Sequence, residues 1–259
     1  MPIGEAYPKA KAAALQALSI NPSSEAHVAL GLVKWLYDWD LAGTRDDIQR
    51  AMEMSPSNEH VHILRGLFLG AMERDPAGAV EEAKATLDVD PLSPMSNFSA
   101  AYVLVFAGEY EQAAERARHT LVLYPDSPLA MTALGWAEVG LGHPFEATSM
   151  FEKAAALAPG AITSTYVAFG LGLTGRRQEA LALLGRLTDG QADRLPDFAE
   201  AMIHIGLGEV DRAFGCMERC LTERDSRIFW FPVVPGLDSL RADPRFDGFM
   251  GRVAAACRN

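Results

Sequence analysis

The chain has 259 residues, of which 49% are hydrophobic, and its formal net charge is −11 because 34 acidic residues outnumber 23 basic ones. This apolar content supports a continuous core and excludes a disordered chain, which needs fewer apolar and more charged residues. The negative charge repels a phosphate backbone, so we expect no nucleic-acid partner. The lack of an 18-residue apolar run predicts that the chain does not span a membrane.

The cysteines and the first residues of the chain indicate the cellular compartment in which we expect the protein. The three cysteines, Cys216, Cys220 and Cys257, are too few and odd in number for a disulfide framework, which favours a reducing environment. The first five residues lack the basic region and apolar core of a signal peptide. We therefore expect a cytoplasmic protein.

The N-terminal segment, residues 1–22, is predicted to be a single helix. Ala10, Ala14, Ala17 and Pro22 match the second helix of the repeat described next, but no first helix precedes them. This helix either caps the array or marks a chain that begins inside a longer protein, and we favour the second interpretation.

Residues 23–225 are dominated by three residue types that recur every 33 to 35 positions. Such a period predicts a stack of about six helix pairs. The proline series begins at the end of the preceding helix and comprises Pro22, Pro56, Pro91, Pro125 and Pro159. The alanine series comprises Ala79, Ala113, Ala147, Ala180 and Ala213, and the glycine series comprises Gly108, Gly142, Gly175 and Gly208.

Each residue type has a physical role in a pair of antiparallel helices. The glycine ends the first helix in a left-handed conformation, the small alanine lets the two helices cross closely, and the proline ends the second helix because it lacks an N–H and clashes with the preceding turn. In the most regular unit, Gly135 faces the second helix and Phe151 fills the groove between the helices.

From about Glu5 to Asp225 these residues resemble the tetratricopeptide repeat (TPR) family. The resemblance implies an all-α, right-handed superhelical solenoid whose first helices line the concave surface. More narrowly, the runs 36–40 and 240–246 resemble repeat modules of bacterial signalling proteins, which follow a winged-helix, nucleotide-cyclase or kinase domain. This implies a regulatory or sensory module of a larger protein.

After Pro159 the period breaks, and the run 189–194 with the late Pro196 predicts a looser loop. The last part, residues 226–259, is predicted to hold an apolar extended segment and a capping helix. Two prolines prevent residues 228–235 from forming an ordinary helix, so Phe229, Trp230 and Phe231 must be buried elsewhere. We favour packing on the last helix pair; folding into the groove or pairing with another copy are the alternatives.

The capping helix is predicted from its start and its apolar stripe. Asp243 and Pro244 suit the N-cap and first helical positions. Phe246, Phe249, Met250 and Val253 then follow at helical spacing.

The first helices place almost no charged residue on the expected concave surface, which predicts a groove for an apolar or aromatic peptide or protein. The predicted contact residues are Trp35, Phe98, Tyr102, Phe106, Trp136, Phe169, Phe198 and Met202. The alternative for each is burial between neighbouring first helices. We predict a non-catalytic scaffold; a self-association module forming a homodimer is the alternative, and a groove-lined enzyme is less favoured because titratable groups are missing there.

Other candidate chemistry is weak, and we expect no catalytic residue, metal or cofactor. Cys216 and Cys220 lie four apart and could supply two ligands, but buried small hydrophobic positions are the better interpretation. His60 and His62 lie on divergent helix faces. His27 is interpreted as structural, and Glu81 and Glu82 as a solvated helix face.

Overall fold

The structure is a computed structural model that describes residues 3–189 and 195–257. Every regular element in this part of the chain is helical. A first helix, α1 (Ile3–Ile20), is followed by six antiparallel pairs: α2 (Ser24–Val33) with α3 (Leu41–Met54), α4 (Glu59–Phe68) with α5 (Pro76–Val89), α6 (Pro94–Ala107) with α7 (Tyr110–Leu123), α8 (Pro128–Gly140) with α9 (Pro144–Leu157), α10 (Ala161–Leu173) with α11 (Arg177–Asp189), and α12 (Asp197–Gly206) with α13 (Val210–Thr222). The predicted all-α solenoid is confirmed.

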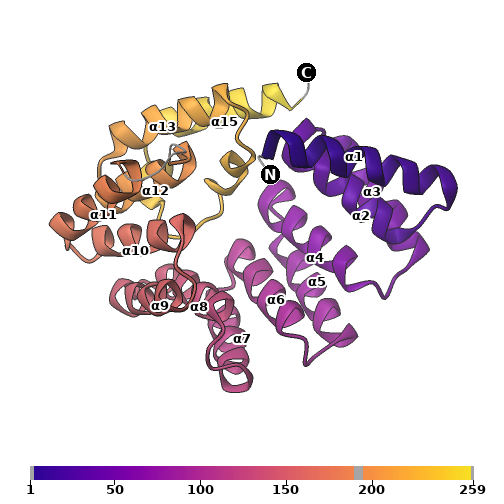
Figure 1. Ribbon diagram of the computed structural model, residues 1–259, viewed down its shortest axis with the longest axis horizontal. Helices are drawn as coiled ribbons and strands as arrows, with labels where there is room; N and C mark the ends of the chain where they lie inside the picture. Colours follow the sequence, from indigo (N-terminus) through magenta and orange to yellow (C-terminus); the bar gives the residue numbers. More distant parts are fainter. Residues whose placement is uncertain (1–2, 190–194, 258–259) are drawn as a thin grey trace.

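The chain ends with short elements. A 3₁₀ turn, η3 (Ser226–Trp230), leads through an irregular stretch to α14 (Asp238–Arg241) and α15 (Arg245–Ala256). Figure 1 shows the helix pairs running around an almost complete circle, so that α15 lies beside α1. The Arg224 side chain joins the two ends of the array, because its guanidinium donates to the Asp38 carbonyl at 3.0 Å and lies 4.7 Å from the Trp39 ring centre.

The first helix of each pair ends in a left-handed residue, but the first two pairs do this without glycine. There α2 and α4 continue as π-helical turns, η1 (Lys34–Asp38) and η2 (Leu69–Glu73), which end at Trp39 (φ 62°) and Arg74 (φ 57°). The later pairs use Gly108, Gly142, Gly175 and Gly208, with φ between 72° and 82°. Trp39 tolerates this conformation because it is buried, with Phe229 and Arg224 packed on its ring.

The alanine positions lie at the crossing of the two helices in each pair. All five alanines of the series are fully buried, and Thr44 takes this place in the first pair, where its hydroxyl donates to the Gly31 and Asp40 carbonyls. Gly135 likewise faces the ring of Phe151, since a Cβ on Gly135 would lie 2.4 Å from that ring. The five prolines of the series lie in the turns between helix pairs. The predicted loop falls mainly on residues 190–194, which lie outside the described residues.

The backbones of α10 and α12 approach each other closely at two glycines, Gly172 and Gly206. A Cβ on Gly172 would lie 2.4 Å from the Gly206 carbonyl carbon and 2.8 Å from the Leu207 nitrogen, so backbone would have to move. We expect Gly172→Ala to lower the free energy of unfolding by about 2 kcal/mol, measured by urea denaturation, although alanine is the better helix former.

The matched control is Gly185→Ala in α11, where an added Cβ meets nothing within 4 Å. That variant should be more stable than the parent by about 0.5–1 kcal/mol, from helix propensity alone. A stabilised Gly172→Ala would show that α10 and α12 are not held this closely.

Candidate binding site on the concave surface

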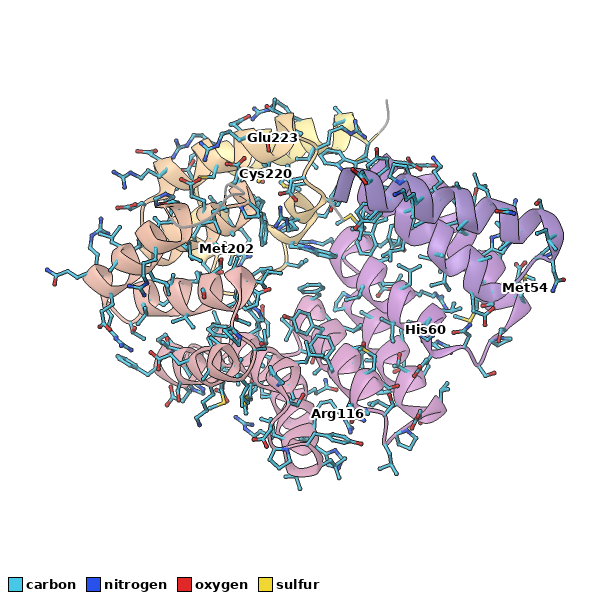
Figure 2. All side chains as sticks on the ribbon, in the orientation of Figure 1. Met54, His60, Arg116, Met202, Cys220 and Glu223 are labelled. Atoms are coloured by element: carbon cyan, nitrogen blue, oxygen red, sulfur yellow. The ribbon has the colours of Figure 1, made fainter. Side chains whose placement is uncertain are left out.

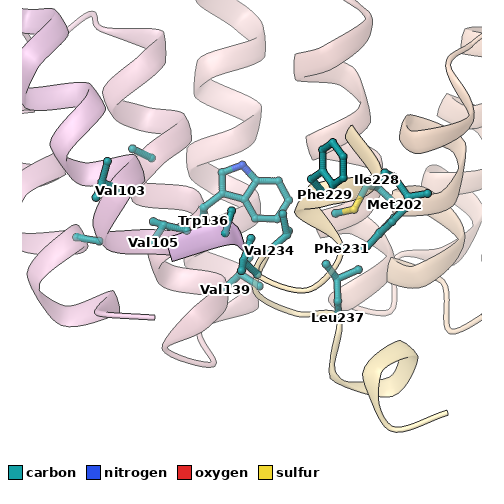
Figure 3. Packing of buried hydrophobic residues seen from close by; sticks show 14 of the residues in the cluster. Val103, Val105, Trp136, Val139, Met202, Ile228, Phe229, Phe231, Val234 and Leu237 are labelled. Atoms are coloured by element: carbon teal, nitrogen blue, oxygen red, sulfur yellow. The ribbon is translucent and has the colours of Figure 1, made fainter. Parts of the chain in front are cut away.

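The concave interior is occupied by the C-terminal segment, which we define as residues 226–237. Trp230 lies between Trp35 and Phe106, with ring centres 5.3 and 5.0 Å away. Phe229 packs on Trp39 at 5.1 Å, and Phe231 on Phe198 at 5.0 Å. Figure 3 shows Trp136 and Val139 of α8, Met202 of α12 and Val234 of the segment gathered in this interior.

The favoured prediction for this segment, packing on the last helix pair, is therefore incomplete, because the segment also folds into the groove, which was one of the alternatives. The prediction that it is extended is wrong, since a 3₁₀ turn is followed by further turns. The segment contacts α13 and Phe198 of α12, but its aromatic side chains reach across to η1, which continues α2, and to α6. The physical reason is ring closure. Once the array curves back on itself, the segment meets the early pairs as well as the last pair.

Arginines hold the backbone of the C-terminal segment in place. The Arg74 guanidinium donates to the Pro232 carbonyl at 2.9 Å, and that of Arg241 donates to the Val234 carbonyl at 2.8 Å. A proline-rich stretch lacks the N–H groups for regular structure, so its carbonyls depend on such side-chain donors. Gly236 (φ 78°) closes the turn, because a Cβ there would lie 2.7 Å from Val139 and 3.1 Å from Phe169.

A pocket of about 250 Å³ remains between the segment and the first helices of five consecutive pairs. Six of the eight predicted contact residues line it: Phe98, Tyr102, Phe106, Trp136, Phe198 and Met202. The other two, Trp35 and Phe169, are fully buried by the chain itself and are not part of the pocket wall. Figure 2 places Met202 on the inner side of the ring and Met54 at its outer rim.

Sequence reasoning missed several residues of the pocket wall. They are Ser99 and Tyr166 from the first helices and Trp230, Val234 and Pro235 from the C-terminal segment; Ile63, Leu67 and Val105 complete the wall. Tyr166 was detectable, because it lies two repeat periods after Phe98, at the same position of the first helix. The segment residues follow no period, but folding of this segment into the groove was one of the alternatives given for it.

The pocket wall carries no charged side chain among the residues that form it. Its polar groups are centred on Tyr102, whose hydroxyl interacts with the Tyr166 hydroxyl and the Trp136 indole. Burial raises the pKa of Tyr102 well above its ordinary value, and the nearby Tyr166 raises it further. Burial also raises the pKa of Tyr166. Both hydroxyls are therefore protonated at neutral pH and able to donate hydrogen bonds.

One edge of the concave surface is left uncovered by the C-terminal segment. The segment contacts mainly the C-terminal halves of the first helices, around Phe106, Val139 and Phe169. At the opposite ends, the first turns of α6, α8 and α10 expose three apolar side chains. We call these residues the open rim: Met95 (50% exposed), Leu129 (46%) and Ile162 (64%).

The buried polar groups outside the pocket pair the two helices of a repeat. His27 Nδ1 lies 2.7 Å from Asp47, and His62 Nδ1 lies 2.7 Å from Glu82, all with little exposure. The interpretation of Glu82 as part of a solvated face is wrong. Its helix turns this side chain, unlike the exposed Glu81, toward His62 and Arg65 in α4.

A further cluster joins Glu200, His204 and Cys216, whose ligand-type atoms all lie within 4.8 Å of one another. The Arg219 guanidinium lies 3.1 Å from the Cys216 sulfur and 3.0 Å from a Glu200 oxygen. His204 Nδ1 is engaged by Glu209 at 2.7 Å. Because Arg219 already supplies a positive charge here, we assign no metal to the cluster.

The cysteines should differ in reactivity. Burial raises the pKa of Cys216 to about 11 and that of Cys220 further still, whereas Cys257 is only half-buried. Alkylation requires the thiolate, so at neutral pH we expect iodoacetamide to modify Cys257 first and to leave Cys216 and Cys220 largely unmodified, as read by peptide mass spectrometry.

In concentrated guanidinium chloride all three cysteines should react alike, which serves as the control. Equal rates for Cys216 and Cys257 in the native protein would contradict the burial of the α13 face.

Comparison with known proteins gives the fold. No protein-family model and no curated protein sequence matches the chain. Similar solved structures include PilW, a type IV pilus biogenesis factor (TM-score 0.58, 19% identity, 72% of this chain and 86% of that one), and PilF of Pseudomonas aeruginosa (0.53, 18%, 88% and 97%). The human IFIT1 dimer with m7Gppp-AAAA is also similar (0.66, 14%, 96% and 66%). These neighbours support a TPR-like fold.

The same fold contains no membrane-crossing element in the part that is described. Among residues 3–189 and 195–257, no helix combines the length and apolar character needed to cross a bilayer.

Proposed function

We propose that this protein is a non-catalytic scaffold that binds a protein or peptide partner through apolar and aromatic side chains. The open rim carries this proposal, because Met95, Leu129 and Ile162 are exposed apolar residues at equivalent ends of three consecutive first helices. Exposed apolar side chains that gather on one face are characteristic of interaction surfaces. The half-buried Phe98 extends the row into the pocket.

The side chains of the C-terminal segment indicate which side chains of a partner the concave surface would accept. Phe229, Trp230 and Phe231 already occupy part of the same surface through ring contacts, so the concave side accepts aromatic side chains from a segment outside the repeats. Large aromatic residues that fill such pockets commonly dominate binding energy. A partner peptide with similar side chains would continue this packing over the open rim.

The similar structures include assemblies with other proteins. One is the APC/C hetero-tetramer Cut9–Hcn1 (TM-score 0.59, 14% identity, 95% of this chain and 46% of that one). The IFIT1 structure contains a capped RNA, but the net charge of −11 opposes a phosphate backbone here, so the proposed partner is a protein. Its place as a cytoplasmic regulatory module of a bacterial signalling protein rests on the runs 36–40 and 240–246 and on the cysteine usage.

The decisive experiment screens a peptide library against the intact protein and then measures affinity for variants of the open rim. Met95→Asp and Leu129→Asp should each raise the Kd for the selected peptides at least about tenfold. The matched control is Met54→Asp, at the outer rim, where methionine is 46% exposed. An equal effect of Met54→Asp, or none in the two rim variants, would exclude the open rim as the binding surface.

Self-association is the second candidate, because the same exposed row could pair with that of another copy. Sedimentation equilibrium over a range of concentrations tests it. A dimer that Leu129→Asp dissociates would favour this alternative, whereas a monomer at all concentrations would remove it.

A further inference from the structure

The pocket inside the ring has the size of a small-molecule site. Its volume is about 250 Å³, whereas an engineered apolar cavity of about 150 Å³ already binds benzene. The additional space suits a molecule with about two fused rings. A peptide does not fit, because the C-terminal segment covers this side of the interior with Trp230, Val234 and Pro235.

The wall of the pocket selects the chemistry of the occupant. Seven of the fourteen residues that line it are aromatic: Phe98, Tyr102, Phe106, Trp136, Tyr166, Phe198 and Trp230. Aromatic rings stack on or meet the edges of one another favourably. None of the lining residues is charged, so an ionic ligand would lose its hydration without a counter-charge.

The polar groups of the pocket wall favour a ligand that carries a hydrogen-bonding group. The Tyr102 hydroxyl interacts with the Tyr166 hydroxyl and with the Trp136 indole N–H, and Ser99 lines the same pocket. Buried hydroxyls keep a favourable state only when they are hydrogen-bonded. A ligand hydroxyl or carbonyl beside Tyr102 would join this group.

We propose that the pocket binds a neutral aromatic small molecule of about two fused rings that carries one hydroxyl or carbonyl group. This site is separate from the open rim and goes beyond the proposed protein-binding function. The ligand contacts five first helices and the C-terminal segment together, so its binding stabilises the closed ring by mass action.

The first experiment uses 1-naphthol as the probe and the full chain as the receptor, with isothermal titration calorimetry as the measurement. We expect one site with a Kd on the order of 10–100 µM and a rise in Tm with probe concentration. Ile63→Trp fills the pocket from α4 and should weaken binding at least about tenfold. The matched control, Ile20→Trp, makes the same change at a side chain that is 76% exposed, outside both the pocket and the open rim, and should leave the Kd unchanged.

A second variant keeps the test informative if Ile63→Trp fails to fold. Tyr102→Phe preserves the ring and removes only the hydroxyl, so it should weaken 1-naphthol about three- to tenfold while leaving 1-methylnaphthalene unaffected. Choline tests the competing cationic class and should not bind.

Three results would overturn the proposal: no binding of either naphthalene probe to the parent protein, an unchanged Kd in a folded Ile63→Trp, or tighter binding of choline than of 1-naphthol. None of them bears on the peptide measurements at the open rim, so the two proposals fail separately.

Discussion

Phe231→Ala is expected to lower the free energy of unfolding by about 3–5 kcal/mol. The Phe231 side chain is fully buried in the middle of the ring, against Phe198 of α12. The neighbouring Trp230 packs on Trp35 and Phe106, so loss of the phenyl ring also loosens the contact between the first and last repeats. Urea denaturation followed by circular dichroism measures the change.

The control for this variant is Phe145→Ala, which makes the same change at a side chain that is 68% exposed at the start of α9. Its stability should stay within about 0.5 kcal/mol of the parent. If Phe231→Ala proved equally harmless, the C-terminal segment would not contribute to the stability of the closed ring.

The repeat was predictable because its determinants are local. A proline, a buried alanine and a left-handed glycine act within one helix pair, and each pair packs mainly on its neighbours. The same logic explains the exceptions. Trp39 and Arg74 adopt the left-handed conformation without glycine, Trp39 with support from Phe229 and Arg224, which lie far away in the sequence.

Ring closure was not predictable from the repeat. The curvature of a solenoid is the sum of small rotations between neighbours, and the sequence period does not specify their size. The destination of Phe229, Trp230 and Phe231 depends on that sum, because only a closed array brings Trp230, which follows the last pair, against Trp35 of the first pair.

The residues of the pocket were predictable only in part. The period places Phe98, Tyr102 and Trp136 on the inner face of the first helices, and the structure brings them together. It does not indicate which inner residues the chain covers itself. Trp35 and Phe169 are as apolar as the others, yet they are buried under the C-terminal segment and Gly236.

The polar pairs between helices follow the same period and went unnoticed. His27 and His62 are 35 residues apart, and so are their partners Asp47 and Glu82. In the next repeat the positive charge moves to the second helix, where Arg116 donates to Asn97 at 3.4 Å. A comparison of the polar residues at equivalent positions of successive repeats would have identified Glu82 as an interior residue.

Glu82→Ala is therefore expected to lower the free energy of unfolding by about 3 kcal/mol. One carboxylate oxygen of Glu82 accepts from His62 at 2.7 Å and the other from Arg65 at 2.8 Å. His62 Nε2 also lies 2.8 Å from the Pro56 carbonyl, so this buried ring has a partner at each nitrogen. Removing the carboxylate leaves this buried ring without its partner, and such a loss is costly.

The neighbouring residue provides the control, because Glu81 is exposed and pairs with Lys84 on the same helix face. Glu81→Ala should change stability by no more than about 0.5 kcal/mol. A double-mutant cycle of Glu82→Ala with His62→Ala should then give a coupling energy of about 1–3 kcal/mol. Additive effects in that cycle would mean that burial of each side chain, rather than their contact, accounts for the loss.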